Sequence, residues 1–531
     1  MKLPQLKFRS VYIFLLFLVL SFLFFGSALN TALLSDDWHW LYLAKNTAWN
    51  FDIFFTNYEG GNLGGSYNPL MLVIFKVFYN LFHLNSSLYH LVSIIIHAVN
   101  AFLVYLLASK LFALVNIKNR SLSLLAGILF LIWPTQVETI NWLAAWPHLW
   151  VATFYLSSFL FYLVWRQKKK LKFLSLSLLL FIISLFIKEI AISLPFVILL
   201  WEIYFFLAKK KYRKQYFIID YFVLLSVFLW MRYQATSLLF GYYGQSEFTW
   251  PIGEWLGHLF GLLSELITFS FTRTLFYKIW YVYLAALVII GLISLLIYLS
   301  IIAYRQKWWQ LSVVLTGLVI LLPLAPLGLH RTSFGGERYL YLVSAFFIIW
   351  LLAVFYKIKF KKYFLILLLL IILPTIIYKN IIWQNASQIS ERIVSSFAEL
   401  EIEDDAKLIS VGLPDNLSGA EVFRNNLQQA LELTYPDYNN QIIHLPVYTF
   451  LNSQNKNSHL LKWRQDEMGW FAESVDGSFV VTGQTSIIVN DIYFELWNYN
   501  YQNYTANIIR LMPDDRDLHW LTYDQGKLQI K

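Results

Sequence analysis

The sequence contains no cysteine and few charged residues. Without cysteine the chain has no disulfide, no thiol nucleophile and no cysteine-ligated zinc. Charged residues make up 14% of the 531 residues, against about 25% in typical soluble domains. Hydrophobic residues reach 58%, and several stretches approach the roughly 20 apolar residues that a spanning helix needs. This composition excludes a disordered chain, disfavours a wholly soluble enzyme and predicts a polytopic α-helical membrane protein.

Acidic residues are scarce in the first part of the chain. Residues 1–380 hold 12 of the 32 acidic residues and 31 of the 41 basic residues, so this part carries a formal charge of +19. Residues 381–531 carry −10. The overall value of +9 would by itself suggest a nucleic-acid partner. Read by segment, the charges instead predict basic cytoplasmic loops and a separate, mildly acidic domain outside the membrane, with no nucleic acid involved.

Apolar runs separated by basic clusters predict eleven spanning helices. The first run follows Lys2, Lys7 and Arg9. A signal peptide cleaved after residues 26–28 is the alternative, but the run is long for a signal, which favours an uncleaved helix. The predicted spans are residues 11–29, 90–108, 121–133, 148–165, 171–187, 190–207, 216–231, 281–302, 310–327, 339–356 and 363–380.

Two further apolar stretches, residues 69–84 and 255–275, do not fit as spans. Counting either one would put a basic cluster on the outer side, so we interpret both as juxtamembrane helices on the outer face. The N-terminus is then cytoplasmic and the C-terminal part is outside. A bacterial or archaeal plasma membrane suits this architecture.

The sequence divides into two predicted domains. Residues 1–380 form the membrane domain, whose first outer loop is 30–89, and residues 381–531 form an extracytoplasmic α/β domain. Hydrophobic and β-branched runs predict strands in the second domain, and a longer periodic stretch predicts a helix. The predicted strands are 408–412, 478–482 and 491–497, and the predicted helix is 421–433.

An acidic pair follows the first predicted span. Asp36 and Asp37 lie in the sequence Ser35-Asp36-Asp37-Trp38. Two adjacent carboxylates at a membrane surface can bind a divalent cation or act as a general base. The same residues fit a helix start equally well, with Ser35 or Asp36 as N-cap and Trp38 and Trp40 as interfacial anchors.

Several other polar residues fall on the same outer face under this topology. Asn68 precedes Pro69 at the start of an amphipathic stretch. His97 and Asn100 belong to the second span, where such residues often form interhelical hydrogen bonds. Glu138 follows the third span, and a carboxylate close to the apolar region tends to face a cavity or a partner. An exposed loop glutamate is the alternative.

Lys188 and Glu189 lie between the fifth and sixth spans. Lysine is disfavoured on the outer side of a membrane, so a phosphate or Glu138 is an expected partner for Lys188. The alternative is an acid–base pair that only solvates a tight turn.

Arg331, Glu337 and Arg338 lie beside glycines between the ninth and tenth spans. Two arginines there suit an anionic headgroup or a diphosphate-like array of oxygens. The alternative is a Glu337–Arg338 ion pair that anchors the loop. Because all these motifs meet on one membrane face, they predict an outward-facing polar cavity holding carboxylates and cations.

The order of these motifs along the chain resembles the order found in the GT-C superfamily of integral-membrane glycosyltransferases. The resemblance covers about residues 10–380 and is to protein O-mannosyltransferases, membrane mannosyltransferases with tetratricopeptide repeats, and bacterial relatives. This sequence has Asn68 where relatives often carry Arg, His or Lys, and it has no such repeats after residue 380. The residues that carry the resemblance are Asp36-Asp37, 67–70, 89–100, 133–142, Lys188-Glu189 with Pro195, and 337–341.

The resemblance implies transfer of a sugar from a polyprenyl-phosphate donor to an acceptor protein, glycan or lipid on the outer face, with inversion. It implies that Asp36, and next Asp37, acts as base or orients the acceptor, and both are candidate ligands of a divalent cation. Candidates for binding the donor phosphate or substrate are Arg338, Arg331, Lys188, Glu138, Glu337, Glu189, His97 and Asn68. The alternatives are a transporter or flippase for lipid-linked glycans, and a non-catalytic scaffold that presents the C-terminal domain.

Overall fold

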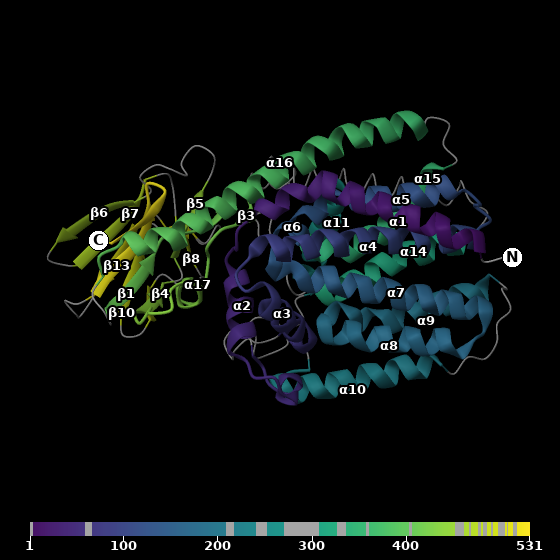
Figure 1. Ribbon diagram of the computed structural model, residues 1–531, viewed down its shortest axis with the longest axis horizontal. Helices are drawn as coiled ribbons and strands as arrows, with labels where there is room; N and C mark the ends of the chain where they lie inside the picture. The colour runs from purple at the N-terminus through teal and green to yellow at the C-terminus, as the bar shows by residue number, and fades with distance from the viewer. Residues whose placement is uncertain are drawn as a thin grey trace.

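The fold is mostly helical, with a strand-rich domain at one end (Figure 1). The structure is a computed structural model. It describes residues 4–58, 66–208, 217–239, 252–269, 307–325, 336–356, 361–402, 406–445, 447–451, 461–466, 469–475, 479–481, 486–489, 492–497, 505–506, 508–512 and 518–530.

Long helices lie side by side in the helical body, the part of the molecule that precedes the strands (Figure 1). The described helices are α1 (Pro4–Phe25), α2 (Asp36–Asn46), α3 (Pro69–Phe82), α4 (Ser86–Leu114), α5 (Arg120–Leu131), α6 (Val137–Asn141), α7 (Trp146–Lys168), α8 (Leu171–Ile187), α9 (Leu194–Leu207), α10 (Ile218–Thr236), α11 (Ile252–Thr268), α14 (Lys307–Leu321), α15 (Tyr341–Phe355) and α16 (Lys361–Ser396). Short 3₁₀ turns connect several of them, among them η3 (Pro134–Gln136), η4 (Leu143–Ala145), η5 (Glu189–Ser193) and η7 (Glu337–Leu340).

Within the described residues, seven helical segments are long and apolar enough to cross a membrane. An eighth is added if α5 and the following segment, which meet at a bend of 46°, count as one span. These eight segments match the predicted spans 11–29, 90–108, 121–133, 148–165, 190–207, 216–231, 339–356 and 363–380.

The other three predicted spans have different outcomes. The stretches predicted as 171–187 and 310–327 are apolar helices that fall short of a full span in length. The stretch 281–302 lies outside the described residues. Because α8 packs along α7 and also contacts α10 and α3, it belongs to the helical body despite its length.

Proline marks where several of these helices begin. Pro69, Pro147 and Pro195 each occupy one of the first two positions of a helix. Proline is favoured there because its missing N–H would have no partner in the first turn and its fixed φ suits the helix. By contrast, Pro374 lies inside the 36-residue α16, where proline removes one backbone hydrogen bond.

The C-terminal domain is built mainly of strands. They form three sheets with strand orders β14-β13-β1-β4, β6-β7-β12-β10-β9 and β11-β8-β5-β2-β3. The strands are β1 (Lys407–Val411), β2 (Leu413–Leu417), β3 (Ala420–Glu421), β4 (Gln441–His444), β5 (Val447–Leu451), β6 (Leu461–Asp466), β7 (Gly469–Ser474), β8 (Phe479–Val481), β9 (Ser486–Val489), β10 (Ile492–Trp497), β11 (Thr505–Ala506), β12 (Ile508–Met512), β13 (Leu518–Asp524) and β14 (Lys527–Ile530).

The three predicted strands of this domain correspond to β1, β8 and β10. The predicted helix 421–433 is wrong in its first half, because α17 covers only Leu427–Thr434. The backbone N–H groups of Val422 and Phe423 donate to the carbonyl oxygens of Asp415 and Pro414, each at 3.0 Å. These bonds hold the segment against β2 and prevent helix formation there.

The two domains meet at one end of the helical body. There α2 packs on α3 and on α17, while α16 runs from the membrane domain into the C-terminal domain and contacts β2, β3 and β14 (Figure 1). The Ser390 hydroxyl of α16 donates to the Leu33 carbonyl at 2.7 Å. This junction positions the acidic pair at the start of α2.

Candidate functional site

Asp36 and Asp37 begin α2, directly after Ser35, whose φ of 37° lies in the left-handed region. The Asp37 side chain is fully buried. Its carboxylate accepts the N–H of Leu34 at 2.9 Å and the N–H of Ala144 at 2.7 Å. Burial raises the pKa of Asp37, and these two amides act in the opposite direction. Asp37 therefore ties the start of α2 to the η4 turn.

Asp36 has a different environment. Its side chain is half-buried, and its Oδ1 accepts a hydrogen bond from the Asn426 amide at 3.0 Å. The neighbouring His39 also lies within electrostatic reach of Asp36, and burial lowers the pKa of that imidazole. Of the predicted acidic pair, Asp36 is thus the member that an incoming molecule can approach.

The buried Glu138 carboxylate forms an ion pair with the partly exposed Arg338 guanidinium. The Glu138 carboxylate also accepts the N–H of Gly336 at 3.2 Å and the N–H of Arg338 at 2.8 Å. The Arg338 guanidinium stacks over the rings of Trp142 and Tyr339, at 4.8 Å from each ring centre. Glu138 is therefore no exposed loop residue: it fixes both the backbone and the side chain of Arg338.

Glu337 pairs with a different helix. Its carboxylate lies 2.5 Å from the Lys379 ammonium of α16, and both side chains are buried. The adjacent Asn380 accepts a hydrogen bond from the Asn141 amide at 2.9 Å. In place of the alternative Glu337–Arg338 pair, the structure has two separate ion pairs, which join η7 to α6 and to α16. Arg331 lies outside the described residues.

Lys188 and Glu189 belong to a second network. The Glu189 carboxylate pairs with Arg232 at 2.9 Å, lies 3.8 Å from Lys188 and accepts the Tyr67 N–H at 2.6 Å. Glu138, one of the two expected partners of Lys188, instead pairs with Arg338. Through these contacts Glu189, which follows Lys188 in the chain, joins the loop before α3 to α10.

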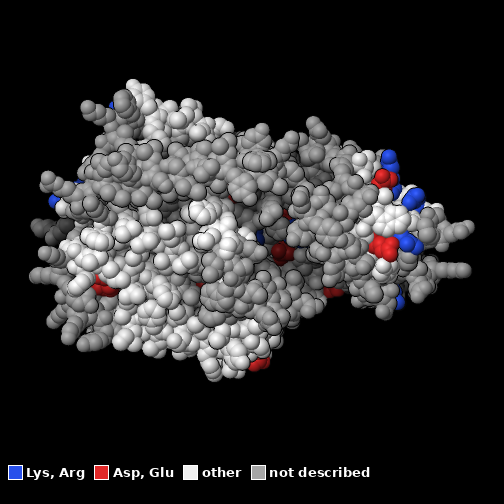
Figure 2. Space-filling view, turned by 180° about the vertical axis from the view of Figure 1, so that it is seen from behind, with Lys and Arg blue, Asp and Glu red and all other residues white. Residues whose placement is uncertain are grey.

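His148 brings the two networks together. It lies within electrostatic reach of both Lys188 and Arg338, and its ring packs edge-on against Tyr339 at 5.2 Å. The structure therefore gathers two of the predicted cations around one histidine at the start of α7. Figure 2 shows acidic and basic side chains in a recess between the helical body and the C-terminal domain.

His97 and Asn68 have mainly structural contacts. The two ring nitrogens of His97 lie 2.7 Å from the Tyr341 hydroxyl and 3.0 Å from the Leu131 carbonyl. This interhelical role is one of the two that the sequence allows. The Asn68 amide donates to the Ser66 hydroxyl at 2.5 Å, just before α3.

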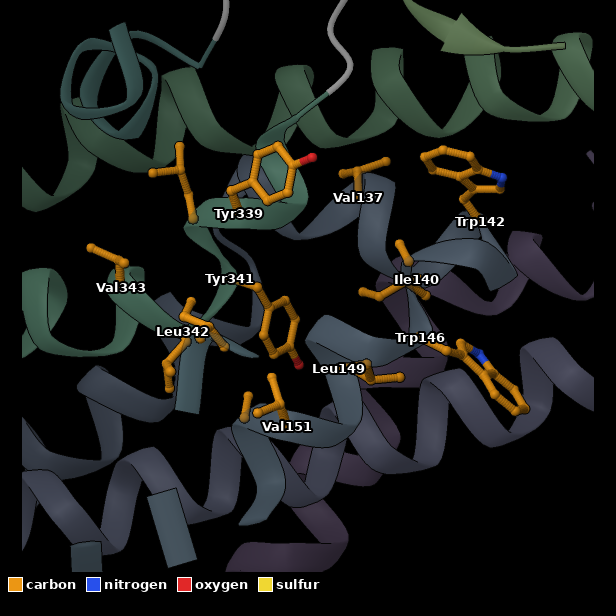
Figure 3. Close-up of a cluster of buried hydrophobic side chains, with 14 of the residues drawn as sticks. Val137, Ile140, Trp142, Trp146, Leu149, Val151, Tyr339, Tyr341, Leu342 and Val343 are labelled. Carbon is orange, nitrogen blue, oxygen red and sulfur yellow. The ribbon is translucent and has the colours of Figure 1, made fainter. Parts of the chain in front are cut away.

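Tyr341 extends from α15 into a packed cluster of aromatic and aliphatic side chains (Figure 3). Its hydroxyl accepts a hydrogen bond from the Asn100 amide at 3.1 Å in addition to its contact with His97. The neighbouring Trp142 and Tyr339 in this cluster are the rings that hold Arg338. The apolar core therefore helps to hold the Arg338 guanidinium in its position.

The predicted metal ligands are not grouped as a preformed metal centre. In the part of the chain that the structure describes, no three or more His, Asp and Glu side chains are placed to hold an ion. Both oxygens of Asp37 already accept backbone N–H groups. A cation at Asp36 would therefore need further ligands such as water, backbone carbonyls or substrate oxygens.

Four residues around these networks were not predicted from the sequence: Arg232, Lys379, Asn426 and Glu421. The last of these is buried within electrostatic reach of Asp36 and Arg338. Arg232 and Lys379 carried a signal, because cations at the outer ends of predicted spans are unusual. Glu421 and Asn426 carried none, since about 390 residues separate them from Asp36 in the sequence.

Neither a protein-family model nor a curated protein sequence matches the chain.

Proposed function

We propose that the chain is a GT-C-type glycosyltransferase of the membrane. It has eleven spans, a cytoplasmic N-terminus and a C-terminal domain on the outer face. The donor is a sugar on a polyprenyl phosphate, and the acceptor is a protein, glycan or lipid on that face. The observation that carries the proposal is the approachable Asp36 carboxylate at the same end of the helical body as Arg338 and Lys188.

The charge distribution supports this orientation. The N-terminus and the start of α16 lie at the end of the helical body remote from the C-terminal domain (Figure 1). Both are rich in lysine and arginine, as is the turn between α7 and α8. Basic residues next to spans favour the cytoplasmic side, so the recess at Asp36 faces outward.

In the proposed reaction, the Asp36 carboxylate removes the proton from an acceptor hydroxyl. The hydroxyl oxygen attacks the anomeric carbon of the donor sugar, and the bond from that carbon to the phosphate oxygen breaks. The electron pair leaves with the polyprenyl phosphate, and the sugar configuration is inverted. A base in hydrogen-bond reach typically contributes about 10²–10⁴-fold to the rate.

Arg338 and Lys188 stabilise the leaving phosphate as its charge develops. Preorganised cations are effective there because they need no rearrangement during the reaction. A guanidinium has five N–H donors and can serve a carboxylate and a phosphate together. The pair with Glu138 and the rings of Trp142 and Tyr339 keep Arg338 in one position.

The test uses purified protein with a panel of radiolabelled polyprenyl-phosphate sugars, with host membrane extract as the source of acceptor. We expect sugar transfer or release from one donor, and a loss of about 10²-fold or more in Asp36→Asn. Asp52→Asn is the matched control, because Asp52 lies in an exposed turn where it accepts from Asn50 at 2.7 Å.

Two outcomes would overturn the proposal. One is a folded Asp36→Asn protein with full transfer activity. The other is no bond cleavage with any donor and extract, together with binding of the labelled lipid and its movement across liposomes. The second result would replace the glycosyltransferase with a transporter of lipid-linked glycans.

A further inference from the structure

The C-terminal domain reaches Asp36 directly. The Asn426 amide donates to Asp36 Oδ1 at 3.0 Å, and the Ser35 N–H donates to the Val422 carbonyl at 3.1 Å. Helices α2 and α17 pack against each other at the same point. The segment 421–426 therefore contacts both the backbone and the side chain of the residues that begin α2.

This segment is held firmly within its own domain. Arg424 forms an ion pair with Asp415, whose side chain is almost fully buried. Asn426 has a φ of 71° and directly precedes α17, whose first residue, Leu427, is buried. Asparagine tolerates the left-handed conformation better than most residues. The direction of the Asn426 amide is thus set by the backbone on both sides.

The same segment also lies near the cation of the site. Glu421 is buried within electrostatic reach of both Asp36 and Arg338. The C-terminal domain thus contributes a carboxyl group close to the proposed base and to the proposed leaving-group cation.

We propose that Asn426 is a positioning residue for Asp36, so that the C-terminal domain forms part of the catalytic site. This inference rests on the proposed function, in which Asp36 is the base. An amide that donates to one carboxylate oxygen fixes the rotamer of the side chain and directs the other oxygen towards the acceptor hydroxyl. Misplacement of a catalytic group by about 1 Å can cost about 10²-fold in rate.

The experiment compares three variants of the full-length protein in the donor assay. Asn426→Gly deletes the amide while glycine accepts the left-handed backbone. Asn426→Asp keeps the shape and places a second carboxylate against Asp36. Gln428→Ala is the matched control, because Gln428 lies two residues further on, in the first turn of α17. Its hydrogen bonds among the described residues stay within the C-terminal domain, with Glu432, Asn440, Tyr438 and the Ile442 N–H.

We expect Asn426→Gly to lower kcat by roughly 10- to 100-fold with an unchanged KM for the donor. In Asn426→Asp the acid limb of the pH–rate profile should move by about one unit to higher pH, because a neighbouring negative charge opposes ionisation of the base. Gln428→Ala should keep the wild-type profile. A merely structural role would lower the unfolding temperature and leave the folded Asn426→Gly protein with the wild-type kcat.

The outcomes separate this inference from the proposed function. If Asp36→Asn loses activity but both folded Asn426 variants keep the wild-type kcat and pH profile, the positioning role alone is overturned. If Asp36→Asn retains full activity, the proposed base and the positioning role are both overturned.

Discussion

At the scale of single residues, two adjacent aspartates have separate tasks. Asp37 is buried and its carboxylate accepts backbone N–H groups from two loops, whereas Asp36 faces the recess and contacts the C-terminal domain. The pattern of two acids at a helix start allowed a base, a metal pair or an N-cap. The structure divides these roles, because neighbouring residues of a helix point about 100° apart and meet different surroundings.

Glu421 makes stability depend on pH. Burial raises its pKa to about 8, although the neighbouring Arg424 opposes this shift, whereas an unfolded glutamate titrates near about 4.3. The folded state thus keeps a proton that the unfolded state releases, so this contribution to stability is complete below pH 4.3 and is lost as the pH rises through 8.

Glu421→Gln, which cannot ionise, should therefore weaken the fall in unfolding temperature between about pH 4.3 and 8, the interval between the unfolded and folded pKa values. Thermal unfolding in detergent at a series of pH values measures this. Identical slopes for the wild type and the variant would contradict the prediction.

At the scale of elements, the buried ion pair between Lys379 and Glu337 joins α16 to η7. Lys379→Met would leave Glu337 buried without this partner, and we expect a loss of about 3–5 kcal/mol in the free energy of unfolding. The double variant Lys379→Met with Glu337→Gln should recover part of that loss, because no charge then remains. Chemical denaturation of the wild type, the single variants Lys379→Met and Glu337→Gln, and the double variant measures the coupling. Additive losses would show that the pair is not coupled.

Helices were easier to predict than the segments between them. Apolar runs of about 20 residues identify spanning segments regardless of their neighbours, and eight of the predicted spans have matching segments. The segment 421–426 shows the limit. The sequence predicts that a helix already begins at residue 421, but the N–H groups of Val422 and Phe423 bond to Asp415 and Pro414. Such tertiary pairing overrides local propensity.

At the scale of the whole molecule, the charge asymmetry predicts an orientation that can be measured. The chain has no cysteine, so single cysteines report their own position without background. Lys527→Cys should react with a membrane-impermeant maleimide on intact cells, and Lys170→Cys should react only after permeabilisation. Both lysines are exposed. Labelling in the reverse order would contradict the proposed topology.

The assembly of the site could be predicted only in part. Charges and spans were enough to expect Asp36, Lys188 and Arg338 on one face, because topology alone decides which loops share a side. Two contacts could not be predicted: the ion pair of Glu138 with Arg338 and the hydrogen bond from Asn426 to Asp36. They depend on how loops fold against each other, which periodicity does not encode.

The length of α16 has a mechanical consequence. Its 36 residues extend over about 54 Å at 1.5 Å per residue, whereas the hydrocarbon core of a bilayer is about 30 Å thick. In the proposed topology, about 24 Å of the helix would therefore extend beyond the hydrocarbon core. Its C-terminal end contacts β2, β3 and β14 (Figure 1). The proposed membrane orientation would thus set how far the C-terminal domain stands from the bilayer.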